Sequence, residues 1–345
     1  MIATLVATLR LNSINLQEFR GVRKIENPPI RLAKFNVLIG KNNSGKTTLL
    51  EALALLPQPN SAWPFIGSPR FGTISTCHGK QGDSLVYGYS GTAVLSYGVG
   101  SNITNMRLET NGHFQFETRS SEDMPQNVVY SPGEDGIYRL DRAPKSLSQV
   151  NSVYYSDDFY ETLTTSIVTE PHWKSIEKTR AHNRVLKEVI NPSITEKFTE
   201  VVPHYVAQQP ILQVRKEFPD GTSSYVRITE LGRGLQRVIV PLLLFEATNP
   251  SICLWDDVEA GMHPSLIENV LKWLFKKDWQ MVIATHSIDI LSTIAELEPR
   301  ETQLVLLDKS ADDLLTYKIV SSDAFSDLVG SGQDPRKMVD LLGLR

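Results

Sequence analysis

The sequence GKNNSGKTT, residues 40–48, has the residue types and spacing of a phosphate-binding loop. Its two glycines, its lysine and the threonine after it match the pattern G-x-x-x-x-G-K-[ST] at every fixed position. In such a loop the glycines let backbone N–H groups face phosphates, the lysine bridges the outer phosphates, and the hydroxyl binds Mg²⁺. We expect the nucleotide contacts to come from Gly40, Lys41, Asn42, Asn43, Ser44, Gly45, Lys46, Thr47 and Thr48.

A second segment, ICLWDD at residues 252–257, offers the carboxylate that a magnesium site needs. Asp256 follows an apolar run, and Asp257 and Glu259 come directly after it. Three acids at the end of a strand are costly unless something positive is bound there, so a solvated acidic loop is the weaker interpretation. The sequence therefore predicts that Thr47 and Asp256 are the Mg²⁺ ligands.

A third segment, MVIATHS at residues 281–287, ends another apolar run with His286. At the carboxyl end of a parallel sheet an imidazole is placed to sense a γ-phosphate. A lone histidine after a strand is more often structural. Combined with the two segments above, the functional interpretation is favoured.

These segments, with INLQEFRGV before them and LGRGLQR between them, resemble the ABC-type ATPases of the structural-maintenance-of-chromosomes, RecF and OLD group. The resemblance covers residues 10–60 and 225–295. It implies a P-loop head with ATP and Mg²⁺ as cofactors, ATP hydrolysis with Lys46 and His286 in catalytic roles, and a segment at 261–265 similar to a D-loop. It also implies two nucleotide sites closed between two subunits, with the signature motif of one subunit capping the P-loop of the other.

Two departures from the family pattern affect the expected chemistry. Asp257 stands where the family has the glutamate that orients the attacking water, so hydrolysis is expected to be slow unless Glu259 takes that role. The signature lacks its serine. Its expected trans residues are Gly232, Arg233, Gly234 and Gln236, with Arg233 placed to act like an arginine finger or to be an exposed helix-end arginine.

Basic residues occur in two further places. The EFRGVRK stretch places Arg20 ahead of the P-loop, and the resemblance implies a nucleotide contact for it, although a surface charge is nearly as well supported. The helical stretch at 173–187 carries Lys174, Lys178, Arg180 and other cations that would suit a phosphate backbone, but Glu177 and Glu188 offset them and favour a solvated face. The loop glutamine of the family remains open between Gln81, Gln115 and Gln126.

The periodicity of the chain predicts an α/β protein with a mostly parallel sheet that both ends of the chain share. We expect strands at 5–13, 28–33 and 34–39, and a helix from the P-loop to Pro57. From about 70 to 150, segments such as DSLVYGYS at 83–90 predict an antiparallel β region. The expected domains are an N-terminal half of the head at 1–150, a helical insertion at 151–205, and a C-terminal half at 206–345.

Composition limits the possible partners. The 345 residues carry a net charge of −4, so any contact with nucleic acid must come from a local patch. Cys77 and Cys253 lack metal or disulfide spacing, and no stretch approaches 18 apolar residues, so a reducing, cytoplasmic setting without membrane contact is expected.

The resemblance thus implies an ATPase whose ATP-dependent homo-oligomerisation drives DNA repair, DNA handling or antiviral defence. Only about 60 residues follow His286, without an acidic cluster long enough for a nuclease, so a nuclease or other effector would be a separate protein. Three alternatives remain: the nucleotide-binding subunit of a membrane transporter, a small-molecule kinase, and a module that holds ATP with little hydrolysis.

Overall fold

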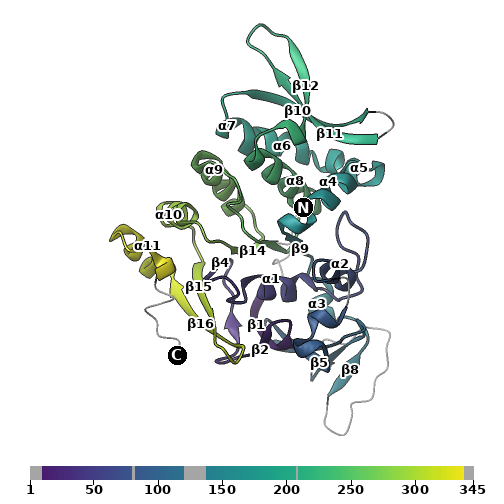
Figure 1. Ribbon diagram of the computed structural model, residues 1–345, viewed down its shortest axis with the longest axis vertical. Helices are drawn as coiled ribbons and strands as arrows, with labels where there is room; N and C mark the ends of the chain where they lie inside the picture. The colour runs from purple at the N-terminus through teal and green to yellow at the C-terminus, as the bar shows by residue number, and fades with distance from the viewer. Residues whose placement is uncertain (1–9, 80–81, 120–136, 207–208, 338–345) are drawn as a thin grey trace, which may run out of the picture.

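The structure is a computed structural model that describes residues 10–79, 82–119, 137–206 and 209–337. Thirteen strands form one large sheet (Figure 1). They are β1 Leu11–Phe19, β2 Val22–Ile25, β3 Ile30–Arg31, β4 Phe35–Gly40, β5 Thr92–Val99, β6 Asn102–Glu109, β7 Phe114–Thr118, β8 Tyr138–Leu140, β9 Ser152–Tyr155, β13 Ile252–Trp255, β14 Gln280–Ala284, β15 Thr302–Lys309 and β16 Leu314–Ser321.

The order of these strands confirms the predicted α/β class. It is β8-β7-β6-β5-β1-β2-β16-β15-β4-β14-β13-β9, with β3 paired to β1. Within it β15, β4, β14, β13 and β9 are parallel neighbours. Strands from both ends of the chain lie side by side, as predicted, and the carboxyl ends of β4, β13, β14 and β9 meet at one edge of the sheet.

Helices cover the sheet and form a lobe beyond it (Figure 1). The helix α1 packs on the face to which Asp256 points, and α8 packs on the other, where Phe245 meets Trp255 at a ring distance of 5.6 Å. The helices are α1 Lys46–Ala54, α2 Arg70–Thr76, α3 Lys145–Ser148, α4 Tyr160–Ile167, α5 Glu170–Thr179, α6 Ala181–Val185, α7 Asn191–Ser193, α8 Arg233–Thr248, α9 Pro264–Phe275, α10 Ile288–Leu297 and α11 Ser322–Gly330.

The antiparallel region joins the main sheet, since β5 pairs with β1 along most of its length. Within it the expected strand at 83–90 is absent. Two short 3-10 turns, Gly82–Leu85 and Tyr87–Tyr89, replace it, because Gly88 adopts a left-handed φ of 64° that interrupts an extended backbone. The expected strand at 5–13 lies partly outside the described residues, and the strand there is β1, which begins at Leu11.

The segment at 151–205 is less helical than the sequence predicts. It opens with β9, which belongs to the main sheet, and ends in β10 Lys197–Val206. The strand β10 forms a small antiparallel sheet with β11 Gln209–Glu217 and β12 Ser223–Arg227, which projects at the far end of the helical lobe (Figure 1). The predicted helical stretch at 173–187 is broken at Arg180, whose φ of 55° ends α5 and begins α6.

Within the described ranges, no helix is both long and apolar enough to cross a membrane.

Candidate functional site

The P-loop connects the buried strand β4 to α1. Its backbone turns through left-handed conformations at Asn43, with a φ of 65°, and at Gly45, with a φ of 94°. Gly45 caps α1 without a side-chain hydrogen bond, and the first turn contains no acid. The N–H groups of that turn are therefore directed at an anion-binding position, where helix N-termini favour phosphate.

Gly40 is required by packing. A Cβ at this position would lie 2.4 Å from the carbonyl oxygen of Leu307 on β15. Because that contact is with backbone, no side chain fits at the start of the loop without moving a neighbouring strand.

The Lys46 ammonium lies folded into the loop. Its Nζ donates to the carbonyl oxygens of Gly40 and Lys41, each at 3.0 Å, and the side chain is 7% exposed. Burial lowers the Lys46 pKa, and the nearby carboxylates of Asp256, Asp257 and Glu259 oppose that shift. A buried cation with only carbonyl partners is well suited to a phosphate.

Thr47 and Asp256, 209 positions apart, meet across the site. The Thr47 hydroxyl donates to Asp256 Oδ2 at 2.7 Å. Burial raises the Asp256 pKa to about 6, against the effects of Thr47 and Lys46. The residues fit a magnesium ion, because a hydroxyl and a carboxylate next to a phosphate loop are the hard oxygen ligands that Mg²⁺ takes in such sites.

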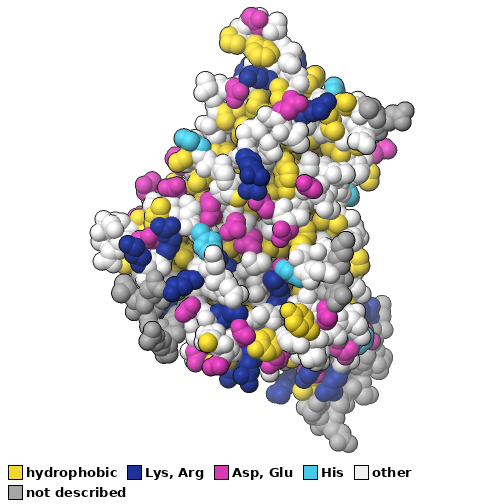
Figure 2. Space-filling view, in the orientation of Figure 1, with side chains coloured by type: hydrophobic (Ala, Val, Ile, Leu, Met, Phe, Trp, Pro, Cys, Tyr) yellow, Lys and Arg dark blue, Asp and Glu magenta, His cyan; other side chains and the backbone are white. Residues whose placement is uncertain are grey.

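The two acids after Asp256 differ in their surroundings. Both oxygens of Glu259 accept hydrogen bonds from the end of β14, one from the Thr285 hydroxyl at 2.8 Å and one from the His286 N–H at 2.7 Å. Asp257 is exposed, with a left-handed φ of 48°. Acidic side chains gather in the middle of the face drawn in Figure 2, at the position that β14 has in Figure 1.

His286 is held through its backbone. Its N–H donates to Glu259, and its carbonyl oxygen accepts from Arg336 Nη1 at 2.9 Å, while the imidazole is exposed. The Arg336 guanidinium is itself paired with Asp334 at 2.7 Å. The loop after β14 is thereby fixed from two sides.

Arg20 contacts the helix that follows the P-loop. Its guanidinium donates to Glu51 on α1 at 2.5 Å and lies 3.3 Å from the His78 ring, which in turn contacts Glu51 at 2.8 Å. Glu51 is buried and lies one turn after Thr47. Arg20 therefore forms an ion pair with the P-loop helix, and its nucleotide contact stays a prediction.

The signature residues lie at the N-terminus of α8. Gly232 is its N-cap and Arg233 is exposed. A Cβ on Gly234 would lie 2.5 Å from the carbonyl oxygen of Gly261, in the segment similar to a D-loop. The Gln236 amide donates to the carbonyl oxygens of Thr229 and Leu231 at 3.1 and 2.7 Å. The signature and the 261–265 segment therefore pack together within one subunit.

A protein-family model described as "AAA domain, putative AbiEii toxin, Type IV TA system" matches residues 35–292, well over half of the chain. The chain belongs to this AAA-domain family. A comparison with curated proteins finds no significant match.

Solved structures support the fold of this AAA domain. A head domain of Smc with an extended coiled coil, bound to the C-terminal domain of ScpA and derived from Pyrococcus furiosus, matches with a TM-score of 0.59 at 9% identity, over 94% of this chain and 99% of that one. An SmcHead bound to the C-winged helix domain of ScpA matches with a TM-score of 0.56 at 12% identity, over 90% and 97%. At these identities the likeness shows the fold alone.

Sequence reasoning missed two contacts in this AAA domain. Tyr154, at the end of β9, places its hydroxyl 3.4 Å from Asp256 Oδ2, and Asp157 pairs with Arg237 of α8 at 2.6 Å. Both follow from β9 lying beside β13, which no motif indicates. Of the candidate loop glutamines, Gln115 lies on β7 in the antiparallel lobe, and Gln81 and Gln126 lie outside the described residues.

The basic stretch at 173–187 is partly neutralised. Lys174 pairs with Glu170 at 2.5 Å, and Arg184 pairs with Glu246. The break at Arg180 also divides the stretch between two helices, so its cations do not follow one helix face.

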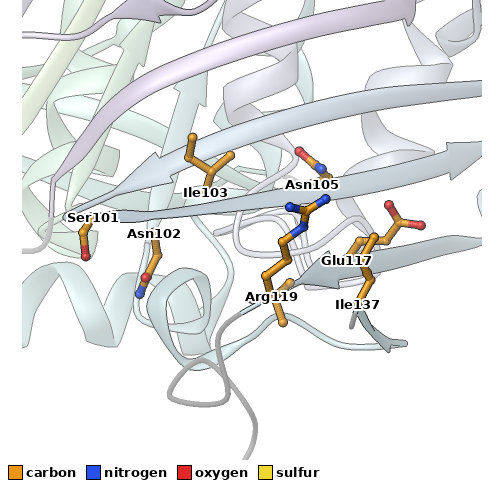
Figure 3. Close-up of a pocket in the computed structure, with 8 residues that line it drawn as sticks. Ser101, Asn102, Ile103, Asn105, Glu117, Arg119 and Ile137 are labelled. Carbon is orange, nitrogen blue, oxygen red and sulfur yellow. The ribbon is translucent and has the colours of Figure 1, made fainter. Parts of the chain in front are cut away.

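A separate cleft of about 520 Å³ lies in the antiparallel lobe (Figure 3). Its lining includes Asn105, Arg119 and Glu117, and Glu117 is paired with Arg107 at 2.8 Å. The strands β6 and β7 of this cleft are separated from β4 by five other strands of the sheet. It is not part of the P-loop site.

Proposed function

We propose that this chain is an ABC-type ATPase that binds ATP and Mg²⁺ between the P-loop and Asp256 and hydrolyses the γ-phosphate bond. The observation that carries the proposal is the 2.7 Å hydrogen bond between Thr47 and Asp256, next to the buried Lys46 ammonium. The P-loop, with its lysine and hydroxyl, and the Asp256 carboxylate come from distant parts of the chain and meet at one sheet edge, as a nucleotide–Mg²⁺ site requires.

Each residue has a role that its position supports. The N–H groups of the P-loop and the first turn of α1 bind the phosphates, and Lys46 leaves its carbonyl partners to contact the outer ones. Thr47 and Asp256 would hold Mg²⁺, which when bound would supply positive charge that neutralises the phosphates. Asp257 orients the attacking water, since its carboxylate is exposed next to Asp256 while both oxygens of Glu259 already accept hydrogen bonds.

A second subunit completes the site in this proposal. Gly232, Arg233, Gly234 and Gln236 of one subunit approach the P-loop of the other, and His286 senses the γ-phosphate. ATP therefore controls a homodimer or larger homo-oligomer. The exposed guanidinium of Arg233, at the first residue of α8, supports a contact in trans.

The process driven by this association is antiviral defence, DNA repair or DNA handling. The family description names a type IV toxin–antitoxin system, which favours defence among the three. The structurally similar Smc heads are bound to a domain of ScpA, so a separate partner protein, such as a nuclease or other effector, is consistent with the same architecture.

The test is ATP binding and hydrolysis by the purified chain and by Lys46→Ala, with and without duplex or single-stranded DNA at two salt concentrations. The variant should bind ATP roughly tenfold more weakly or worse, since a hydrogen bond to a charged group contributes about 1.5–3 kcal/mol. Stimulation by DNA should weaken as salt rises. A wild-type chain that binds no ATP rejects the proposal, and hydrolysis indifferent to DNA favours a protein partner.

A second candidate is an ATP-holding module with little hydrolysis. The double engagement of Glu259 and the shortness of Asp257 favour it over the transporter and kinase alternatives. This candidate would be identified if ATP drives complete association of the subunits while less than one ATP is hydrolysed during the lifetime of a dimer. Co-purification with a permease would instead revive the transporter subunit.

A further inference from the structure

The strand beside the magnesium-site carboxylate brings a buried phenol to it. The strand β9 runs parallel to β13, with Tyr154 opposite Leu254 and Tyr155 opposite Trp255. Because side chains alternate along a strand, Tyr154 faces the same side of the sheet as Leu254 and Asp256, the side covered by α1. Tyr155 faces the other side, where its ring packs on Trp255 at 5.8 Å.

The Tyr154 hydroxyl lies 3.4 Å from Asp256 Oδ2. That distance is long for an O–H···O bond, so its contribution is to orientation more than to binding energy. The Thr47 hydroxyl contacts the same oxygen at 2.7 Å. Both donors therefore act on Oδ2, and neither competes for Oδ1.

The phenol is held in place on its other sides. The Tyr154 ring lies 6.0 Å from the Trp63 ring and 5.8 Å from the Phe159 ring, and those two are 5.0 Å apart. Tyr154 is only 1% exposed.

We propose that Tyr154 is a positioning residue for the divalent ion: its hydroxyl, together with Thr47, fixes the Asp256 carboxylate in the orientation that binds Mg²⁺. This inference rests on the proposed function. It places on β9 a contact to the Asp256 carboxylate. Gln115, the candidate loop glutamine among the described residues, lies on β7 in the antiparallel lobe. Tyr154 acts through Asp256 and is not itself a metal ligand or a catalytic residue.

Two adjacent tyrosines provide a matched pair of variants. Tyr154→Phe removes the hydroxyl and keeps the ring in its three-ring cluster. Tyr155→Phe removes a hydroxyl that is buried without a hydrogen-bond partner among the described residues, on the opposite side of the sheet. Both changes delete one oxygen from the same strand and keep the aromatic ring.

The measurement is the binding of a fluorescent ATP analogue to the full chain, first in EDTA and then as MgCl₂ is added. Tyr154→Phe should raise the Mg²⁺ concentration at half-maximal response by roughly tenfold, and Tyr155→Phe by less than about twofold, as expected when a residue that orients a metal ligand is removed. Binding in EDTA should be equal in all three proteins. Mn²⁺ binding followed by electron paramagnetic resonance should give the same ranking.

The outcomes separate the two levels of inference. A wild-type chain that binds no nucleotide overturns the proposed function and, with it, this assignment. A wild-type chain that binds normally, with an unchanged Mg²⁺ midpoint in Tyr154→Phe, overturns the assignment alone. A loss of binding in EDTA by Tyr154→Phe also overturns it, since the hydroxyl would then support the fold and not the metal ligand.

Discussion

At the scale of single residues, the two acids after Asp256 have different jobs. Both oxygens of Glu259 accept hydrogen bonds, one from the Thr285 hydroxyl and one from the His286 N–H, so Glu259 holds the loop that carries His286. Asp257 keeps an exposed carboxylate in a left-handed backbone conformation. A group that orients water needs an acceptor within reach of that water, and in the proposed function the exposed Asp257 carboxylate supplies it.

Replacing each acid by its amide distinguishes these jobs. Asp257→Asn should lower the single-turnover rate of ATP hydrolysis by about 100-fold, within the usual contribution of a general base, with ATP affinity retained. Glu259→Gln keeps one acceptor and loses the other, so a smaller fall in rate and a lower melting temperature are expected. If Glu259→Gln is the more damaging variant and melts normally, the assignments of the two acids are reversed.

The site residues that the sequence predicts are those marked by a motif within one short stretch of the chain. Asp256 directly follows the apolar strand β13, and Lys46 and Thr47 follow β4 across the loop at 41–45, so pattern and strand type together predict their place at the sheet edge. Tyr154 and the pairing of Arg20 with Glu51 depend on which strand or helix lies alongside. That information is absent from any short stretch of sequence.

At the scale of elements, α8 approaches the 261–265 segment closely at Gly234. A Cβ at Gly234 would lie 2.5 Å from the Gly261 carbonyl oxygen, whereas a Cβ at Gly232 would meet nothing within 4 Å. Neither glycine has a positive φ, so neither position requires glycine for its backbone conformation, although Gly232 is the N-cap and Gly234 lies in the first turn of α8. This contact fixes the start of α8 against the loop that follows Asp256.

Gly234→Ala should therefore destabilise the chain by about 1–3 kcal/mol, the usual cost of overpacking, even though alanine favours the helix by about 0.5–1 kcal/mol. Gly232→Ala is the matched control and should change the free energy of unfolding by less than about 1 kcal/mol. Urea unfolding of both variants measures the difference. Equal stabilities would mean that the two segments separate freely.

Element prediction failed where backbone torsion mattered more than periodicity. The stretch at 173–187 has a continuous helical pattern, yet Arg180 adopts a left-handed φ of 55° and divides it. Hydrophobic spacing reports which face is buried, and it does not report a turn inserted between two helices. DSLVYGYS likewise alternates like a strand but forms two short 3-10 turns, because the left-handed torsion of Gly88 in the second turn is not visible in the pattern.

At the scale of the whole molecule, the large sheet joins the two halves of the chain around one site. The strand β4 carries the P-loop and lies between β14 and β15, from the other end of the chain. Shared parallel sheet was predictable from the alternation of apolar strands and helices. The continuity of that sheet with the antiparallel lobe was not, because it depends on the pairing of β5 with β1.

The proposed two-subunit site predicts that two inactive variants restore activity to each other when they form mixed dimers. Lys46→Ala removes the phosphate ligand, and Arg233→Ala removes the trans arginine, so each variant alone should hydrolyse ATP poorly. In an equal mixture, half of the dimers are mixed, and each mixed dimer has one site with both residues intact. The mixture should recover roughly a quarter of the wild-type rate. Arg233→Lys alone should hydrolyse ATP more slowly than wild type, because an ammonium lacks the fork of a guanidinium. A mixture no faster than the average of its two components would mean that Arg233 of one subunit does not serve the P-loop of another, even if the chain binds ATP as proposed.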